Sequence, residues 1–460
     1  MKWWLKMKRS SIFLLCILAV ATCAQAPVVT IDCAPGTVSS TTLPDGRIQI
    51  KCQPVATPVP APSPPIGLIV APDGKPSGAG TLSDPRDLQS AIAAASPMKS
   101  GNVYLRGGKY VGPFVSTLAA PVTVRAYPGE KPVLVCGGPD QNQPVLTVQG
   151  SQTIWRDFEV HCPTADRSKP IGPGVNALAS GSKFINLMIH DCGGGFGFWT
   201  PAVDAEVYGC IIYHNGWQGA DPDRGHGHGI YTQNETGKKL IGENIVFDQY
   251  GWGLHAYTEG GFIKGFDVWG NALFNNGSAS REGSHANILV GGMKPAERVS
   301  IMENFTYHGG AQMLNIELPF GKAANLDLNL TGNYFIGGVT ALGKNWATVN
   351  AQGNVIVGQL QVPAPLPVGW TVANNATVIK LDKVFVRPNK YEEGRANVIV
   401  YNGSRAASVA VDLSNTLKSG DKFELYEIHN LSKPLLSGSY SGIIQVPVQG
   451  EFGCFVVRRL

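Results

Sequence analysis

Short apolar segments recur along the middle of the chain, and each is followed by a polar residue, a second apolar segment and a turn that contains glycine. Successive repeats are separated by 24, 34, 27, 33, 29 and 21 residues. A coil of about twenty-odd residues explains the shorter spacings, and inserted loops explain the longer ones. This irregular period excludes a propeller and predicts stacked parallel coils over residues 100–360. The polar positions are Asn186, Cys210, Asn244, Asn271, Asn304, Asn333 and Asn354.

Asparagine, the commonest residue at these positions, suits the turn of such a coil. Its side chain tolerates left-handed backbone, and it can hydrogen-bond its copies in the coils above and below. We therefore expect the asparagines to form a column at one turn.

The segments that flank the repeats have different patterns. Before the repeats, Asp84 is a good N-cap residue and Pro85 suits the first position of a helix. Apolar residues between Leu88 and Ala95 would share one face of this helix, which could cover the open end of a solenoid. After the repeats, residues 369–460 contain alternating strands joined by polar turns, which predict a small antiparallel sandwich.

The first 26 residues have the pattern of a secretory signal, with a basic start, a short apolar run and small residues ending at Ala26. This run is too short to span a membrane, and no later stretch is long enough. Cys23 would allow a lipoprotein, but Thr22 before it disfavours that alternative. We therefore expect a secreted protein, either extracellular or periplasmic. Residues 27–65 are predicted to form a short β segment and a proline-rich spacer.

Removing the signal segment changes the charge of the chain. The formal net charge of +4 is supplied by four cations within that segment. The remaining chain is neutral, so nothing in its charge argues for a nucleic-acid partner.

Seven cysteines remain after residue 26. In an oxidising compartment a disulfide between Cys33 and Cys52 would close a short loop, and we favour this pairing over the others. Cys192 and Cys210 could also meet across adjacent coils. The odd number leaves at least one free thiol.

Two segments at the start of the repeat region, Gly80–Ile92 and Gly101–Tyr110, resemble the corresponding part of pectate-lyase-like proteins. The resemblance covers about residues 66–360. It implies an all-β fold, a right-handed parallel β-helix with an N-terminal capping helix, and a bias toward polysaccharide lyases, hydrolases and epimerases. No catalytic motif of one family matches, so no catalytic residue follows from the resemblance.

The domain boundaries that we expect are 66–368 for the β-helix and 369–460 for the small C-terminal antiparallel β-sandwich. The sandwich looks like the β-domains appended to many glycosidases, although it could merely cap the solenoid.

Eight of the nine histidines lie between residues 161 and 308, which marks this window as the place to look for chemistry. Because side chains alternate along a strand, aligning the strands after each turn predicts two rows on one outer face. Aromatic rings there would pack on sugar C–H faces, and amides or carboxylates would bind hydroxyls, although the rings could also merely cover the solenoid. The first row is Trp199, Tyr231, His255, Asn287 and Asn315, and the second is Pro201, Gln233, Tyr257, Leu289 and Glu317.

We predict from these rows a groove that binds a polysaccharide or oligosaccharide. The predicted substrate contacts are Trp199, Gln233, Glu259, Asn287, Asn315 and Glu317.

A glycine-rich loop with many polar residues, from Asp221 to His228, directly precedes the strand of Tyr231 and should overhang this groove. Its imidazoles could converge on a proton, a substrate oxygen or a metal. The catalytic candidates are Asp223, Arg224, His226, His228, Tyr231, His255 and Tyr257.

Three chemistries remain open for these residues. In β-elimination, Arg224 would neutralise a uronate while histidines or tyrosines act as base and acid. In hydrolysis, a carboxylate pair would come from Asp221, Asp223, Glu259, Glu282 or Glu317. A divalent metal, calcium or zinc, is the third option, and zinc would be held by His226, His228, His255 and Asp223.

We favour a secreted polysaccharide lyase, because basic, histidine and tyrosine groups outweigh any obvious carboxylate pair. The alternatives are a glycoside hydrolase and a non-catalytic polysaccharide-binding or adhesin β-helix.

Overall fold

The computed structural model describes the backbone of residues 36–42 and 48–54, and also residues 65–98, 100–137, 141–164, 166–310, 313–378 and 382–460. The predicted signal segment, Cys33 and most of the proline-rich spacer lie outside the described residues, so the Cys33–Cys52 disulfide stays a prediction. Strands β1 (Gly36–Thr42) and β2 (Ile48–Pro54) form an antiparallel pair. Residues Ile66–Leu460 form one compact unit.

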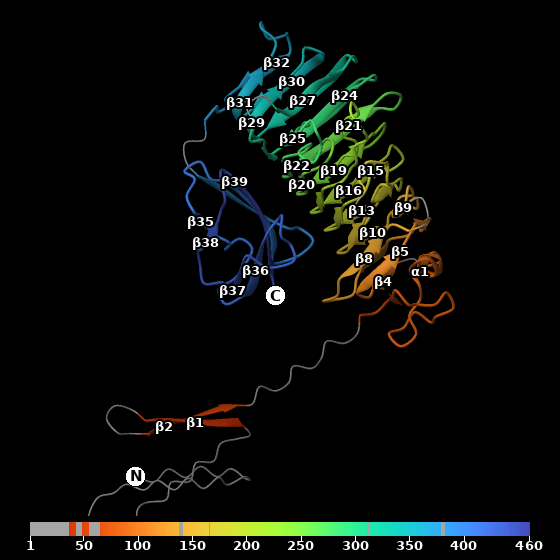
Figure 1. Ribbon diagram of the computed structural model, residues 1–460, viewed down its shortest axis with the longest axis vertical. Coiled ribbons are helices and arrows are strands. Elements are labelled where there is room, and N and C mark those ends of the chain that lie inside the picture. Colours follow the sequence, from red (N-terminus) through yellow and green to blue (C-terminus); the bar gives the residue numbers. More distant parts are fainter. Residues whose placement is uncertain are drawn as a thin grey trace, which may run out of the picture. The chain divides into compact units, whose positions relative to one another are not determined.

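This unit is built around a right-handed parallel β-helix, as predicted (Figure 1). Each complete coil contributes one strand to each of three columns of parallel strands, which we call the first, second and third columns. In the last coils the second and third columns merge, because β29 (Tyr334–Ala341) pairs with both. The apolar side chains of all three columns fill the inside of the coils as one continuous core.

The strands of the three columns follow one another along the chain. The first column is β3 (Leu68–Val70), β4 (Gly101–Leu105), β7 (Val122–Ala126), β10 (Ile154–Arg156), β13 (Lys183–Ile185), β16 (Ala205–Tyr208), β19 (Lys239–Gly242), β22 (Ile263–Trp269), β25 (Ala296–Met302), β28 (Asn325–Thr331), β30 (Trp346–Gln352) and β32 (Trp370–Ala373). The second column is β5 (Gly108–Val111), β8 (Pro132–Val135), β11 (Glu159–His161), β14 (Met188–His190), β17 (Ile211–Tyr213), β20 (Ile245–Phe247), β23 (Ala272–Phe274), β26 (Phe305–Tyr307), β29 and β31 (Val355–Gln361). The third column is β6 (Phe114–Ser116), β9 (Leu146–Val148), β12 (Val175–Ala177), β15 (Phe196–Phe198), β18 (Ile230–Thr232), β21 (Leu254–Thr258), β24 (Ile288–Gly292) and β27 (Leu314–Gly321).

The predicted asparagine column stands at the turn between the first and second columns. Asn304, for example, donates to Asn333 (Nδ2 to Oδ1, 3.1 Å) and accepts from Asn271 (2.9 Å). The column runs from Asn244 to Asn375, one coil further than predicted. Each link buries an amide with its hydrogen-bonding partners, which fixes the register of successive coils.

One part of this prediction was wrong. Asn186 lies one position before the column, where it adopts a left-handed φ of 55°. Its structural counterparts in later coils include Glu243 (φ 55°) and Glu303 (φ 52°), so the left-handed residue precedes the stacked asparagine. In the two coils before Asn244 the column position is occupied by Leu187 and then Cys210, so the amide ladder begins at Asn244.

The single helix of the described residues, α1 (Leu88–Ala95), packs its apolar face on the first coils as predicted (Figure 1). It begins later than expected. Asp87 is the N-cap and accepts from the Ser90 N–H at 2.9 Å, whereas the Asp84 carboxylate accepts from the Ala79 N–H at 2.8 Å. No helix among the described residues is long and apolar enough to cross a membrane.

The C-terminal sandwich has a five-stranded antiparallel sheet and a two-stranded one around its own core. It begins after the predicted boundary, because β32 still pairs in parallel with β30 beyond residue 368. The strands are β33 (Lys383–Pro388), β34 (Arg395–Tyr401), β39 (Phe452–Arg459), β36 (Lys422–Glu427) and β37 (Leu436–Ser439) in the larger sheet, and β35 (Ser408–Val411) and β38 (Ile444–Pro447) in the smaller.

The sandwich packs along the second column of the β-helix rather than over its end. Ile399 and Tyr401 of the sandwich join a buried cluster with Phe247, Phe274 and Phe305 of the second column. Ion pairs surround this cluster, among them Arg387 with the nearly buried Glu243 (2.5 Å). Such a mixed apolar and charged interface holds the sandwich on the coils.

The cysteines of the β-helix pair differently from our expectation. Cys192 and Cys210 are both free and buried, and each thiol donates to a backbone carbonyl. The disulfide among the described residues joins Cys136 to Cys162, on neighbouring coils. Cys192 follows β14 at the turn between the second and third columns, whereas Cys210 precedes β17 at the turn between the first and second. Adjacency of coils alone therefore does not bring the two thiols together.

Candidate functional site

One row of side chains lies on the outer face of the third column. In each strand, the residues directly before and after the one in this row point into the core. Strand pairing aligns Tyr231 with His255, and His255 with Leu289. Glu317 continues the row on β27, and Tyr257 lies two residues along β21 on the same face. The row runs Asn176, Gly197, Tyr231, His255, Leu289 and Glu317.

This register corrects the placement of Asn287 and Asn315. Both were expected on the groove, but both are fully buried. Asn287 accepts from Asn276 (2.7 Å) and donates to Asn315 (2.9 Å), so they form a second amide ladder, at the turn between the second and third columns. Side chains on this ladder cannot contact a ligand on the outer face. Pro201 is exposed after the end of β15 and belongs to neither row.

Trp199 reaches the row by folding back over it. Gly197 is the residue that pairs with Tyr231, and a Cβ at Gly197 would come within 2.7 Å of the Trp199 indole nitrogen. The indole therefore occupies the space that a side chain at residue 197 would take. It donates to the Asn176 Oδ1 at 3.0 Å and lies 5.3 Å from the Tyr231 ring. The predicted neighbourhood of Trp199 and Tyr231 is present, although by a different route.

Two histidines form a directional pair beside Tyr231. The Trp252 backbone N–H donates to His228 Nδ1 at 3.4 Å, which leaves the His228 Nε2–H to donate to His255 Nδ1 at 3.1 Å. His255 then carries its proton on Nε2, and that atom is buried without a partner. Burial lowers the pKa of His255 to about 3 and the pKa of His228 well below its usual value, with Coulombic repulsion from His255 and Arg224 adding to the effect on His228. The pair is therefore neutral at neutral pH.

Aromatic stacking joins this pair to Arg224. The His255 ring stacks between Tyr257 (5.1 Å) and Trp252 (4.9 Å). The Arg224 guanidinium lies 5.4 Å from the Trp252 ring and donates to the Gly225 carbonyl. Among the described residues, no carboxylate lies within ion-pair distance of Arg224. The exposed guanidinium is thus contacted by a ring and a carbonyl, and no carboxylate of the described residues pairs with it.

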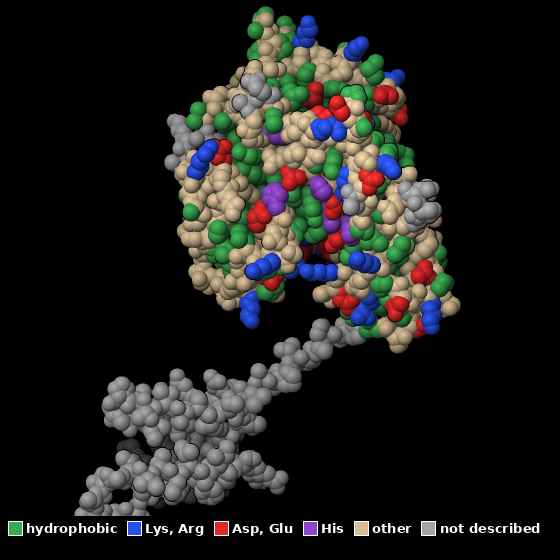
Figure 2. All heavy atoms as spheres, in the orientation of Figure 1, with side chains coloured by type: hydrophobic (Ala, Val, Ile, Leu, Met, Phe, Trp, Pro, Cys, Tyr) green, Lys and Arg blue, Asp and Glu red, His purple; other side chains and the backbone are tan. Residues whose placement is uncertain are grey.

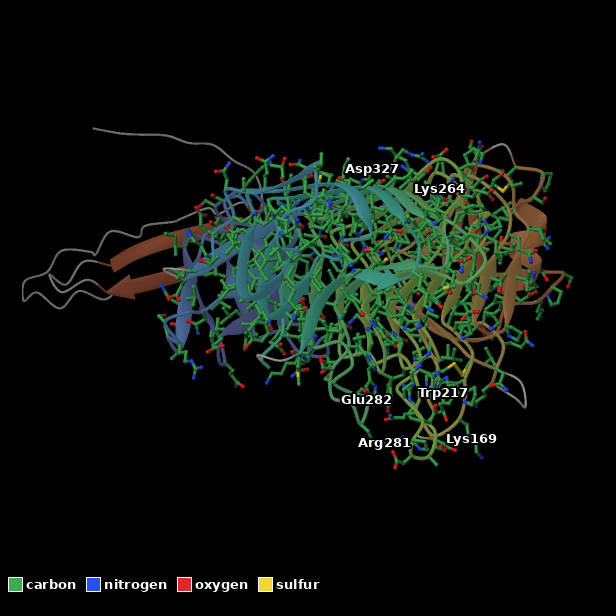
Figure 3. The ribbon with its side chains drawn as sticks, turned by 90° about the horizontal axis from the view of Figure 1, so that it is seen from above. Lys169, Trp217, Lys264, Arg281, Glu282 and Asp327 are labelled. Atoms are coloured by element: carbon green, nitrogen blue, oxygen red, sulfur yellow. A yellow bond between two sulfur atoms is a disulfide. The ribbon has the colours of Figure 1, made fainter. Side chains whose placement is uncertain are left out.

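The loops before β18 and β24 form a wall beside these residues. Figure 3 shows Trp217, Arg281 and Glu282 on loops that project from the same side of the β-helix. Glu282 accepts from the Gly225 N–H (3.1 Å), and Arg281 donates to the Asp223 carbonyl (2.7 Å). Glu282 therefore supports the loop that carries Arg224, which gives this carboxylate a structural role.

His226 and Asp223 pair with each other rather than with the other candidates. His226 Nε2 lies 2.7 Å from an Asp223 carboxylate oxygen, and its ring stacks on Trp217 at 4.1 Å. The zinc set predicted from Asp223, His226, His228 and His255 is not assembled. Within the part of the chain that the structure describes, the group of ligand atoms placed for a metal is elsewhere.

The remaining polar candidates lie along the same face. The Gln233 amide donates to the Tyr231 hydroxyl (3.2 Å), and the Tyr257 hydroxyl donates to the exposed Glu259 (3.3 Å). Burial raises the pKa of both tyrosines, and Glu259 raises that of Tyr257 further. Glu317 is half-buried, and burial raises its pKa against an opposing hydrogen bond from Trp252.

A pocket of about 180 Å³ opens at one end of the row. Its lining includes Asn176, Gly197, Trp199, Gly227, His228 and Tyr231. A larger hollow of about 270 Å³ lies near the last coils, but Lys344 is its sole ionisable lining residue. Of the catalytic candidates, His228 and Tyr231 line the smaller pocket, whereas Arg224, His255 and Tyr257 lie outside its lining.

Comparison with solved structures agrees with this architecture. The pectate lyase Pel9A superposes with a TM-score of 0.52 at 15% identity, covering 67% of this chain and 78% of the other. This likeness shows that the two proteins share the β-helix fold. A rhamnogalacturonan lyase (TM-score 0.45, 15% identity, 68% and 90% covered) and an alginate lyase from Paenibacillus (0.42, 17%, 63% and 96%) are more distant. No family model and no curated protein sequence matches the chain.

Sequence reasoning missed two residues of the site, Trp252 and His285. The Trp252 ring stacks on His255, and its centroid lies 4.2 Å from that of the His285 ring. Trp252 therefore links the third-column row to the loop before β24. One signal could have identified Trp252. It lies between Gly251 and Gly253, directly before β21, which is where the predicted overhanging loop lies in the preceding coil.

Proposed function

We propose that the protein is a secreted carbohydrate-active enzyme that cleaves an acidic polysaccharide by β-elimination. The observation that carries the proposal is the uncompensated Arg224 guanidinium beside neutral histidines and two tyrosine hydroxyls. Such a cation suits a substrate carboxylate, which would supply the missing negative charge. The shared fold with a pectate lyase supports a polysaccharide substrate, and the signal-like first 26 residues support secretion.

In the proposed reaction Arg224 binds the uronate carboxylate and acidifies the neighbouring C–H group. The Glu259 carboxylate takes that proton, the electron pair becomes the new C=C bond, and the C–O bond to the leaving sugar breaks. The Tyr257 hydroxyl protonates the leaving oxygen, since its raised pKa keeps it protonated at neutral pH. The hydrogen bond between Tyr257 and Glu259 then returns the proton from the acid to the tyrosine and resets the site.

The histidine pair has a positioning role in this scheme. His255 is 6% exposed and its free nitrogen is buried, so it does not reach a substrate. Its ring fixes Tyr257 on one side and Trp252 on the other. A neutral imidazole between them leaves Arg224 as the positive charge that the substrate meets.

A second candidate is glycoside hydrolysis, which the raised pKa of Glu317 favours. Hydrolysis needs one carboxyl group that stays protonated and a second that is ionised. Glu317 could serve as the acid, with Glu259 as its partner.

The deciding experiment is incubation with pectate, alginate, rhamnogalacturonan and a neutral polysaccharide. If the protein acts by β-elimination, we expect an ultraviolet band from unsaturated uronates together with new reducing ends. Both signals should appear with an acidic polysaccharide and not with the neutral one. New reducing ends without that band would favour hydrolysis, and neither signal on any substrate would contradict both enzymatic proposals. The Arg224→Ala variant should lower kcat/KM on the acidic substrate, while Arg298→Ala, an exposed arginine on the first column, should not change it.

A further inference from the structure

A second group of histidines lies on the outer face of the second column, away from the candidate active site. Strand pairing aligns His161 with His190, and His190 with Tyr213. Their rings stack at 5.0 and 4.6 Å, and the stack continues to Phe247 and Phe274 in later coils. The sandwich covers the later rings, whereas His161 and His190 keep 16% and 11% of their side-chain surface exposed. Figure 2 shows histidine and acidic side chains gathered in a hollow on this face.

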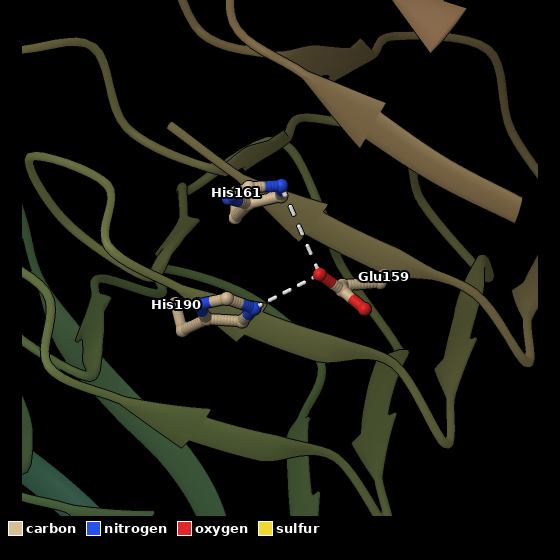
Figure 4. A group of neighbouring side chains, drawn as sticks. All are labelled: Glu159, His161 and His190. Carbon is tan, nitrogen blue, oxygen red and sulfur yellow. Dashed lines mark hydrogen bonds and ion pairs between the residues drawn. The ribbon is translucent and has the colours of Figure 1, made fainter. Parts of the chain in front are cut away.

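Glu159 points one carboxylate oxygen at both imidazoles (Figure 4). The Oε1 atom lies 3.2 Å from His190 Nε2 and 3.8 Å from His161 Nε2. All three ligand atoms lie within 4.8 Å of one another. For zinc bonds of about 2.0–2.1 Å, tetrahedral geometry places ligand atoms roughly 3.3–3.5 Å apart. The three atoms therefore surround a volume of the size that one such ion needs.

A surrounding hydrogen-bond network orients His190 for this role. Its Nδ1 lies 2.7 Å from Asp191, which also accepts from His214 (2.6 Å) and Arg167 (2.7 Å). A carboxylate on one imidazole nitrogen places the lone pair on the other nitrogen and raises its strength as a ligand. In His190 that other nitrogen is the one that faces Glu159. Without a cation or a second proton between them, the lone pairs of His190 Nε2 and Glu159 Oε1 would oppose each other across 3.2 Å.

We propose that Glu159, His161 and His190 bind one divalent transition-metal ion of the zinc type. Two imidazoles and one carboxylate suit zinc, cobalt or nickel, whereas calcium prefers an all-oxygen shell with more ligands. Three protein ligands leave a position for water, and the partial exposure of the site gives an ion a way in. The site belongs to the first coils and the neighbouring loop network, so it is independent of the elimination chemistry proposed above.

The test is calorimetric titration of zinc chloride into the full, untagged protein after removal of metals with a chelator. We expect one zinc per chain, and calcium chloride should give no comparable binding. His161→Ala and His190→Ala should weaken zinc binding by more than about 100-fold, since loss of an outer-shell partner alone costs about 10–100-fold. Asp191→Asn should show that smaller effect. His226→Ala is the matched control, because His226 pairs with Asp223 in the loop before β18 and is not one of the three ligands, and it should leave zinc binding unchanged.

Two outcomes would overturn the proposal. One is absence of zinc binding to the wild-type protein, and the other is wild-type affinity in both histidine variants. Circular dichroism must show that each variant is folded. Glu159→Gln gives a second, nearly isosteric test that leaves the ring stack intact, and it should also weaken zinc binding.

Discussion

The asparagine column makes a quantitative prediction about stability, and Asn304→Ala is its sharpest test. Asn304 is fully buried, and its side chain makes five hydrogen bonds. It donates to Asn333 and to the carbonyls of Val268 and Met302, and it accepts from the backbone and side-chain amides of Asn271. Alanine removes all five bonds at once.

The expected loss follows from the groups that remain. The Asn271 backbone N–H would be left buried with no acceptor, which alone costs about 1–3 kcal/mol. The Asn271 side-chain amide keeps its bond to the Ile241 carbonyl, so its loss is smaller. Adding the other lost bonds at about 1 kcal/mol or less each, we expect the free energy of unfolding to fall by roughly 3–5 kcal/mol.

Urea unfolding followed by circular dichroism measures this change, and hydrogen exchange localises it. Protection should fall in β22, β25 and β28, because each coil of a solenoid depends chiefly on its neighbours. The matched control is Asn350→Ala, since Asn350 is an exposed asparagine of the first column that donates to Asn329 at 2.8 Å. This control should change stability by about 0.5 kcal/mol or less. A loss below about 1 kcal/mol for Asn304→Ala, or equal losses in the two variants, would refute the energetic role of the column.

Three further predictions address the active site and the sandwich interface. Tyr257→Phe should lower turnover on a cleaved polysaccharide by about 10²–10⁴-fold with an unchanged circular dichroism spectrum, and a wild-type rate would remove Tyr257 as the acid. Asp248 and Glu427 raise the pKa of His429 to about 9, so its stabilising contribution is complete below its unfolded pKa of about 6.5 and disappears as the pH rises through about 9. The melting temperature should fall over that range, and His429→Gln should flatten the fall; identical pH profiles would contradict the assignment. Arg387→Met leaves Glu243 buried without its partner and should destabilise the protein by about 3–5 kcal/mol in urea unfolding. Adding Glu243→Gln should recover part of this loss, and no recovery would mean that the pair is not the cause.

The sequence alone was sufficient for the architecture. Coils of a solenoid repeat their polar and apolar positions, so the parallel stack, the asparagine column from Asn244 onward and the apolar face of α1 can be derived from local pattern. The sandwich follows from alternation in the same way. These features depend on short-range periodicity, which the chain carries within each repeat.

Register within the third column could not be derived so directly. The loops between the second and third columns differ in length from coil to coil, so counting from one asparagine does not give the position of the next strand. The predicted alignment was wrong by two residues: it set Asn287 beside His255, whereas Leu289 pairs with His255 and Asn287 lies just before β24. This error placed Asn287 and Asn315 on the predicted groove instead of in the buried ladder, and it hid the way Gly197 makes room for Trp199.

The partners of individual side chains were decided by the tertiary structure. Eight histidines crowd one window of the sequence, but winding the chain into coils sends His161 and His190 to the second column and His228 and His255 to the third. It also pairs His226 with Asp223 rather than with either group. Nothing local distinguishes these histidines, because a coil places residues side by side that lie a full turn apart in the sequence. Contact between them depends on which residues of each coil form strand and which form loop, and only the folded coil shows that division.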